Sequence, residues 1–342
     1  MVQLGTSAAA GYCGLLLTYG GAEVVVVDPE DLPADAAAAA VRTYLGAGKG
    51  ARDLDLANES GRAELRALLA GASCLIADRT LPELAELGLA IDRATVAANS
   101  LVVVCVTPWG SEGPAAMREA SDLHMFHAGG LGAITPRFAN NPDEPPLRTG
   151  YPLSEYLLGL NAAVAAMAGL NHLRETGEGS VIDVSGQQAI AHASSIYFAA
   201  WSYEHRRSSR VSRPGLAPFH FLPCRDGHIM IICPEEHQWR ALVELMGNPE
   251  WAQSELFETS VTRALYWDAI EPELVAWMAD KTRDELYHLA QEKRVPLAPV
   301  NNVEAVLASE HLANRGFFVP LPPVNSNLMA PGRAFKQQSP LA

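Results

Sequence analysis

The chain has 342 residues, of which 49% are apolar and 19% charged, and its formal net charge at pH 7 is −14. This composition supplies enough apolar residues for a substantial core, and the length favours one large domain or two smaller ones. The negative charge argues against binding to nucleic acid or to anionic membranes, which attract basic surfaces.

Predicted helices alternate with short apolar strands in the first half of the chain. The expected helices are Ser7–Tyr19, Ala36–Leu45, Arg62–Ala70, Leu81–Leu87 and Leu153–Leu173. The expected strands are Ala22–Val27, Ser73–Ala77, Leu101–Val106 and Ser180–Ser185. Because short β-branched runs alternate with helices, the pattern predicts an α/β fold with a Rossmann-like parallel sheet covered on both faces.

The second half predicts a smaller α+β unit after a proline-broken stretch. The expected helices are Gln187–Tyr203, Glu236–Met246, Trp267–Ala279, Thr282–Gln291 and Val303–Ala308, and the expected strands are His228–Cys233 and Val295–Val300. We therefore expect a large domain at residues 1–205, a linker at 206–218 and a small domain at 219–319. Residues 320–342 are expected to return to the large domain.

The cysteines and the apolar runs predict a cytoplasmic protein. The five cysteines show no C-x-x-C pairing and mostly sit in apolar runs, which is typical of reduced core residues. The helix at Leu153–Leu173 is the most membrane-like segment, but Glu155 and Asn161 favour a buried helix. No basic n-region with a cleavage site precedes the first helix, so export is not expected.

The most informative stretch is Gly150–Ser185, in which a lone acid, Glu155, opens an apolar, glycine-spaced helix. A tight turn and the strand Ser180–Ser185 follow. This stretch resembles the signature of class III CoA-transferases, the family of formyl-CoA and carnitine CoA-transferases and the 2-methylacyl-CoA racemases. In that family an Asp four residues before the glycine, here Gly159, takes the acyl group from CoA.

The resemblance extends over some 300 residues in order and spacing. The matching motifs are Tyr19-Gly20-Gly21-Ala22-Glu23-Val24, Gly48-Lys49, Leu54-Asp55-Leu56, Thr107–Pro114, Asp226-Gly227, Gln238-Trp239, Gly247–Trp251 and Val295–Val300. The resemblance implies the class III CoA-transferase fold, with a large CoA-binding domain, a smaller α+β domain and an interlocked dimer.

The resemblance assigns the nucleophile to Glu155. A carboxylate can attack a thioester to give a mixed anhydride, and glutamate carries the same group as aspartate. The extra methylene moves the oxygens by roughly 1.5 Å, and a misplacement of that order can cost ~100-fold in rate. Alternatively, Glu155 caps the helix that follows it without doing chemistry.

The resemblance also implies a CoA site in the large domain. Small residues after the first apolar segment let CoA approach the backbone, as helix N-termini do for anions. The implied CoA-binding residues are Thr6, Ala8, Ala9, Leu54, Asp55, Leu56, Asp78, Arg79, Thr80 and Asp122. The chain has no G-x-G-x-x-G motif, so a nicotinamide cofactor is not expected, and neither is a metal. CoA and acyl-CoA are implied as substrates, with no tightly bound cofactor.

Several family cations are replaced by acids. Glu86 and Glu119 stand where the family usually carries basic residues, which predicts weak CoA affinity because a cation forms charge-assisted hydrogen bonds with phosphate. The possible substitutes are Arg42, Lys49, Arg52 and Arg79.

Two further departures concern racemases and the mobile glycine loop. The racemases of the family place a catalytic His immediately before the Asp that aligns with Asp122, where this chain has Ser121, and His124 is shifted. The glycine loop that shields the anhydride is expected at Arg213–Pro218, which holds one glycine.

Three functions follow from the resemblance. The first is transfer of CoA from an acyl-CoA to a free carboxylic acid through an acyl-glutamyl anhydride. The second is a non-catalytic structural half of a paired transferase, and the third is an acyl-CoA racemase or epimerase. The expected partners are an acyl-CoA, a carboxylic acid, and either a second copy of the chain or a second homologous half.

Overall fold

The computed structural model describes residues 1–27, 36–89, 91, 96, 100–136, 143–211, 215–321 and 328–336. The chain divides into two compact units. The large unit comprises residues 1–136, 143–209 and 316–342, and the small unit is built on residues 210–315. Residues 212–214 of the expected linker lie outside the described residues.

The large unit is built on a six-stranded parallel sheet with the strand order β3-β2-β1-β4-β5-β6. The strands are β1 (Val2–Leu4), β2 (Val25–Val27), β3 (Gly50–Arg52), β4 (Cys74–Ala77), β5 (Val102–Thr107) and β6 (Ser180–Ser185). The expected α/β fold with a parallel sheet is confirmed. Strand β3 was not expected, because its Gly-Ala-Arg sequence is exposed and carries no β-branched residue.

Helices cover both faces of this sheet. They are α1 (Ala8–Tyr19), α2 (Ala36–Leu45), α3 (Glu59–Ala70), α4 (Leu81–Glu86), α6 (Asp122–Ala128), α7 (Leu153–Thr176), α8 (Gly186–Ala193) and α9 (Ser195–Glu204), with the 3-10 turn η1 (Leu131–Ile134). Val102 and Val104 of β5 pack into one apolar cluster with α1 and α7. Val103 and Cys105 point the other way, into a cluster that includes Leu65 of α3. Side chains of one strand therefore alternate between two buried layers.

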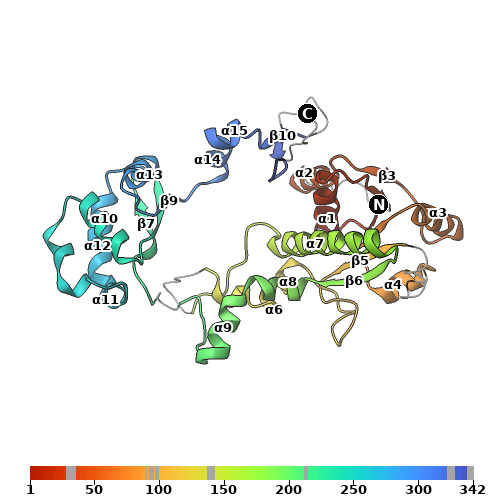
Figure 1. Ribbon diagram of the computed structural model, residues 1–342, viewed down its shortest axis with the longest axis horizontal. Coiled ribbons are helices and arrows are strands. Elements are labelled where there is room, and N and C mark those ends of the chain that lie inside the picture. The colour runs from red at the N-terminus through yellow and green to blue at the C-terminus, as the bar shows by residue number, and fades with distance from the viewer. Residues whose placement is uncertain are drawn as a thin grey trace. The chain divides into compact units, whose positions relative to one another are not determined.

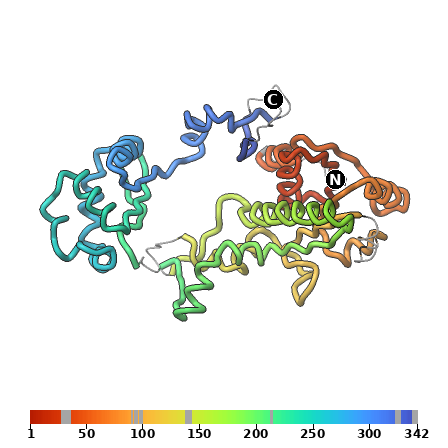
Figure 2. The backbone as a smooth tube through the Cα atoms, in the orientation of Figure 1, coloured from red at the N-terminus to blue at the C-terminus, as the bar shows by residue number. Residues whose placement is uncertain are grey.

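Helix α7 lies beside α1 and against β5 and β6, as Figures 1 and 2 show. Close approach depends on glycine: a Cβ at Gly159 would come within 2.5 Å of the Ala9 carbonyl oxygen. A Cβ at Gly169 would come within 2.8 Å of Ile182 and Val102. Helix α7 is also the one described helix long and apolar enough to cross a membrane, but seven of its residues are buried within this unit.

One expected helix is wrong. The chain does not run as a single helix over Gln187–Tyr203, because α8 ends before Ser194 and α9 begins after it. Ser194 has φ −98° and ψ 14°, outside helical geometry, and its hydroxyl donates a hydrogen bond to the Ile190 carbonyl. Such local side-chain bonds compete with helix continuation.

The large unit also contains a small antiparallel pair of strands from the C-terminal segment. These are β10 (Phe318–Pro320) and β11 (Met329–Pro331). The hydroxyl of Tyr19 at the end of α1 donates a hydrogen bond to the Pro331 carbonyl at 3.3 Å.

The small unit has a three-stranded antiparallel sheet with the order β7-β8-β9. Its strands are β7 (Phe219–Cys224), β8 (Gly227–Ile232) and β9 (Leu297–Pro299). Its helices are α10 (Glu236–Leu245), α11 (Ser260–Leu265), α12 (Trp267–Met278), α13 (Arg283–Glu292), α14 (Val303–Leu307) and α15 (Glu310–Asn314), with 3-10 turns η2 (Glu250–Gln253) and η3 (Glu255–Phe257). Arg263 is fully buried and pairs with Glu236 at 2.8 Å. Its other donors bind backbone carbonyls, so the buried guanidinium has hydrogen-bond acceptors for its charge.

Candidate active site

The candidate site begins where β1 ends and α1 starts. Gly5 has φ +95°, and a Cβ there would overlap the Asp78 carboxylate. Glycine therefore lets Asp78, at the end of β4, accept a hydrogen bond from the Ser7 amide at 2.8 Å. The Ser7 hydroxyl in turn accepts from the Ala10 amide and caps α1.

Glu155 lies in the first turn of α7 and reaches the same helix end. Its Oε2 accepts a hydrogen bond from the Ala9 amide at 3.0 Å, so the longer glutamate side chain spans from α7 to the N-terminus of α1. Burial raises the pKa of Glu155, and the hydrogen bond from Ala9 opposes this. The carboxylates of Asp122 and Asp78 raise its pKa further.

Asp122, from the first turn of α6, holds the start of α7. Its Oδ1 accepts hydrogen bonds from the amides of Ser154 at 2.7 Å and Glu155 at 3.2 Å. The N-cap residue of α7, Pro152, makes no side-chain capping bond. Asp122 therefore supplies from another helix the acceptor that α7 lacks, and it fixes the backbone that carries Glu155.

Three tyrosine rings lie close to one another near the contact between α1 and α7. The ring centroids of Tyr12 and Tyr156 are 4.7 Å apart, and those of Tyr151 and Tyr156 are 6.4 Å apart. Tyr12 follows Ala9 by one turn, and a Cβ at Gly159 would come within 3.1 Å of the Tyr12 Cβ. The rings thus lie within a turn of the residues that position Glu155.

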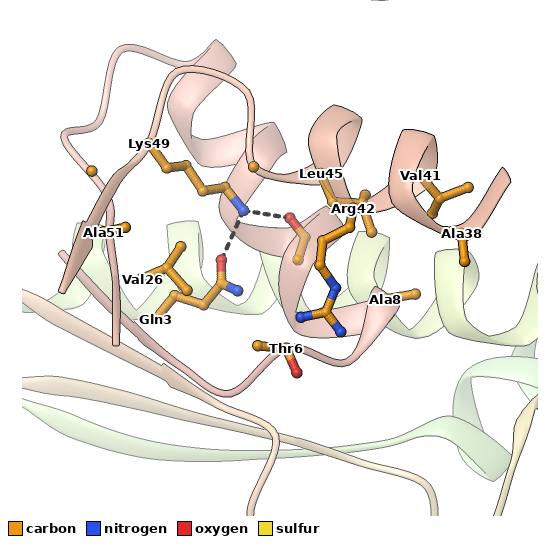
Figure 3. Close-up of a pocket in the computed structure, with 13 residues that line it drawn as sticks. Gln3, Thr6, Ala8, Val26, Ala38, Val41, Arg42, Leu45, Lys49 and Ala51 are labelled. Atoms are coloured by element: carbon orange, nitrogen blue, oxygen red, sulfur yellow. Dashed lines mark hydrogen bonds between the residues drawn. The ribbon is translucent and has the colours of Figure 1, made fainter. Parts of the chain in front are cut away.

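A cavity of about 530 Å³ opens on another face of α1, toward α2. Its lining residues are Gln3, Thr6, Ala8, Gly11, Val26, Ala38, Val41, Arg42, Leu45, Gly46, Lys49, Gly50 and Ala51. Figure 3 shows Lys49 bonded at one end and the Arg42 side chain extending toward Thr6. The walls are mostly apolar, with two cations.

Lys49 is held in this cavity by two acceptors. Its Nζ donates to the Gln3 Oε1 and to the Gly11 carbonyl, each at 2.7 Å. A Cβ at Gly14 would come within 2.9 Å of the Lys49 Nζ, so glycine at this position leaves room for the amine. Burial lowers the pKa of Lys49 to about 7, so the amine loses its proton near neutral pH.

The structure brings some of the expected site residues together and separates others. Thr6 and Ala8 line the cavity, and the Ala9 amide binds Glu155. Leu54 and Leu56 belong to the apolar core, with 6% and 8% exposure. Three further expected residues interact with near neighbours in the chain. Asp55 accepts a hydrogen bond from the Ala57 amide, and Thr80 forms a capping box with Glu83. Burial raises the pKa of Asp78, and the positive charge of Arg79 opposes this.

Two of the four substitute cations, Arg42 and Lys49, line the cavity. Arg52 instead donates to the adjacent Ala51 carbonyl. Glu86 and Glu119 are both exposed. Gln3 was not predicted as a site residue, although a polar amide between the apolar residues Val2 and Leu4 could have indicated it. Tyr12 and Tyr156 were not predicted either, because their rings meet only when α1 packs on α7.

His124 has a local role in α6. Its Nδ1 lies 3.1 Å from the Ser121 amide and 2.9 Å from the Ser121 hydroxyl, within the capping box of this helix. Of the expected glycine loop, Arg213 and Pro214 lie outside the described residues. In the described ranges no group of three or more His, Cys, Asp or Glu side chains is arranged to hold a metal ion.

The fold and the site together define an α/β protein with a half-buried carboxylate at a helix N-terminus and a cavity beside it that is lined by Lys49 and Arg42. The sequence matches the model of CoA-transferase family III over residues 1–339, and the chain belongs to that family. The expected family is confirmed.

The sequence is also similar to curated proteins, at identities of 27% or less. The chain is 27% identical over 270 residues to the alpha subunit of succinyl-CoA–L-malate CoA-transferase of Chloroflexus aurantiacus, covering 78% of this chain and 62% of the relative. It is 24% identical over 328 residues to succinyl-CoA–D-citramalate CoA-transferase of the same species, covering 92% and 80%. The chain thus spans less than two thirds of the alpha subunit.

The fold agrees with a solved structure. A crystal structure of a CAIB/BAIF family protein from Brucella suis superposes with a TM-score of 0.85 at 24% identity, covering 98% of this chain and 90% of that protein. This likeness establishes the fold of the chain.

Proposed function

We propose that the chain transfers CoA from an acyl-CoA thioester to a free carboxylic acid, with Glu155 carrying the acyl group. The observation that carries this proposal is the placement of a half-buried carboxylate on the α1 amide end, with a cationic cavity on another face of the same helix. Homologues named as CoA-transferases support transfer of CoA in general.

The chemistry balances without a further reactant. Glu155 attacks the thioester carbonyl carbon, forms a mixed anhydride and releases the CoA thiolate. The thiolate then attacks the glutamyl carbonyl carbon, releases the donor acid and leaves a glutamyl thioester. An acceptor carboxylate attacks the glutamyl carbonyl carbon of that thioester, forms a second mixed anhydride and releases the thiolate. The thiolate then attacks the acceptor's carbonyl carbon, which forms the new acyl-CoA and releases the Glu155 carboxylate.

The N-terminal end of α1 supports this reaction. The Ala9 amide donates to Glu155 in the free site, and the positive end of a helix stabilises negative charge on oxygen. Burial raises the pKa of Glu155, and a weakly solvated carboxylate is the more reactive nucleophile once ionised.

We place CoA in the cavity between α1 and α2. Arg42 supplies positive charge there for phosphate groups, and Lys49 adds to it when its amine is protonated, which a bound phosphate favours. Thr6 and Ala8 bring the backbone close. Acyl-CoA and CoA are substrates in this proposal, and the reaction uses no other cofactor.

We further propose that the chain works as a pair, with a second copy or with a homologous half, in the cytoplasm. Leu160, Val164 and Met167 form an exposed apolar stripe along α7, and stripes of this kind commonly become covered on association. The five cysteines are free thiols, which suits a reducing compartment. A monodisperse monomer at micromolar concentration in sedimentation would contradict the pairing.

A second candidate is a non-catalytic half of a paired enzyme. The Chloroflexus relative is named as one subunit of its enzyme, which is consistent with pairing. In that case the partner would carry the nucleophile, and Glu155 would only join α7 to α1.

An isotope-exchange experiment separates the two candidates without knowledge of the natural acceptor. Each of succinyl-CoA, butyryl-CoA and phenylacetyl-CoA is incubated with its own ¹⁴C-labelled acid, and label entering the thioester is measured. We expect exchange with at least one pair, its loss in Glu155→Gln and its retention in Glu155→Asp. Exchange that is unchanged in Glu155→Gln would refute the acyl-glutamyl mechanism at this residue. No exchange by the wild-type chain alone would favour the non-catalytic half.

A further inference from the structure

Lys49 has different hydrogen-bond partners from a surface lysine of the same chain. It is half-buried, and its Nζ donates to the Gln3 Oε1 and to the Gly11 carbonyl, each at 2.7 Å, so that both acceptors are neutral. The exposed amine of Lys293 instead pairs with the Glu244 carboxylate, also at 2.7 Å. The described residues therefore hold the Lys49 amine with dipoles and not with a negative charge.

The surroundings of Lys49 favour its neutral amine. Burial lowers the pKa of Lys49 to about 7, whereas the hydrogen bond to Glu244 raises the pKa of Lys293. Cys13 of α1 acts on the Lys49 amine, but burial raises the pKa of this thiol to about 12 and keeps it uncharged. Arg42 of α2, which lines the same cavity, adds no negative charge.

The cavity between α1 and α2 opens this amine to an electrophile. A neutral primary amine has two N–H groups and one lone pair, and Gln3 and Gly11 accept from both N–H groups (Figure 3). The lone pair is then available for reaction. Lys49 lines a space of about 530 Å³, and Gly14 leaves room for the amine, because a Cβ at that position would come within 2.9 Å of the Nζ.

We propose that Lys49 is a site of covalent acylation by small acyl thioesters. Its neutral amine attacks the thioester carbonyl carbon, an amide bond forms, the carbon–sulfur bond breaks, and the leaving thiolate takes up the proton that nitrogen loses. The donor enters with its acyl end toward Lys49 and competes with CoA held by its phosphates. Acylation removes a positive charge from the cavity, so it should weaken CoA binding. The modification needs only the cavity, whereas this consequence rests on the proposed function.

The test follows acetylation of Lys49 and Lys293 in the full chain by S-acetyl-N-acetylcysteamine, a thioester without phosphates, with mass spectrometry of the digested protein. At pH 7.5 we expect Lys49 to react at least about tenfold faster than Lys293, although Lys293 is more exposed, because more of the Lys49 amine is neutral. The rate at Lys49 should level off above about pH 8 and the rate at Lys293 should keep rising. In guanidinium chloride the two rates should agree within about twofold.

Two results would overturn the modification site: acetylation of Lys293 as fast as that of Lys49 in the folded chain, or the same rate ratio in the folded and the unfolded chain. Calorimetry then tests the consequence. Acetylated wild type should bind CoA as weakly as Lys49→Gln, and Lys49→Arg treated in the same way should keep its affinity. Selective acetylation of Lys49 with unchanged CoA affinity would keep the modification site and overturn the proposed placement of CoA.

Discussion

Two faces of helix α1 show opposite chemistry. Toward α7, the Ala9 amide binds Glu155, and the neighbouring charges are carboxylates. Toward α2, the Gly11 carbonyl and Gln3 hold Lys49, and Arg42 lines the same cavity. One small-residue helix therefore separates a side that carries carboxylates from a side that carries Lys49 and Arg42, which we propose as the reaction side and the binding side. Under the proposed function, this difference allows a chain with net charge −14 to bind a phosphorylated ligand.

Removing the Lys49 amine from the cavity should weaken CoA binding more than any other change proposed here alters activity or stability. Lys49→Met is expected to weaken CoA binding about 10- to 150-fold, because a charge-assisted hydrogen bond is worth roughly 1.5–3 kcal/mol. Calorimetry with free CoA measures this directly. Lys293→Met, at an exposed surface pair with Glu244, is the matched control and should leave CoA affinity within about twofold. Equal affinity of wild type and Lys49→Met would place CoA elsewhere.

On the reaction side, Asp122 should act through the position of Glu155. Asp122→Ala removes the acceptor of the Ser154 and Glu155 amides, and it should lower unfolding stability by about 1 kcal/mol and exchange by about tenfold. Asp122→Asn keeps an acceptor oxygen and should restore most of the stability. Because Asn removes a like charge, the acid limb of the pH–rate profile should move to lower pH. A profile identical to wild type would contradict this role.

The pH dependence of CoA binding tests whether the protonated Lys49 amine contributes to the affinity. Burial lowers the pKa of Lys49 to about 7. A bound phosphate favours the protonated amine, so affinity should fall by up to about tenfold between pH 6 and pH 8, with proton uptake on binding. Lys49→Arg stays charged throughout and should lose this component of the pH dependence. If the affinity of wild type and of Lys49→Arg varied with pH in the same way, the titrating group would be on CoA and not Lys49.

The smallest expected effect concerns stability. The pKa of Glu155 is raised by folding, so its favourable contribution is present at low pH and is lost as pH rises through the folded pKa. Glu155→Gln does not titrate and still offers an acceptor to the Ala9 amide. The melting temperature of Glu155→Gln relative to wild type should therefore increase from pH 5 to pH 8. Glu86→Gln at an exposed position is the control, and a falling difference would show that the ionised carboxylate stabilises the fold.

Much of the large unit could be predicted from sequence, because its strands are short β-branched runs and its helices carry clear breaks. Strand β3 could not, since Gly50–Arg52 has no strand-like residues and is defined by its pairing with β2. The continuous helix over Gln187–Tyr203 was wrong because the break at Ser194 depends on a local hydrogen bond.

The candidate site was predictable in part. Glu155 stands out as a lone acid in an apolar run, and the small residues Thr6 and Ala8 mark a close backbone approach to the cavity. The role of Asp122 was not predictable, because it depends on the packing of α6 against α7, more than 30 residues apart in the chain. Leu54 and Leu56 match a family motif but serve the core, which a motif alone does not reveal.

Covalent trapping decides whether Glu155 carries the acyl group. The chain is incubated with phenylacetyl-CoA or succinyl-CoA, treated with borohydride or hydroxylamine, and digested for mass spectrometry. We expect modification at Glu155, with none in Glu155→Gln and none without the thioester. Modification at another carboxylate, or exchange activity with an unmodified Glu155, would contradict it.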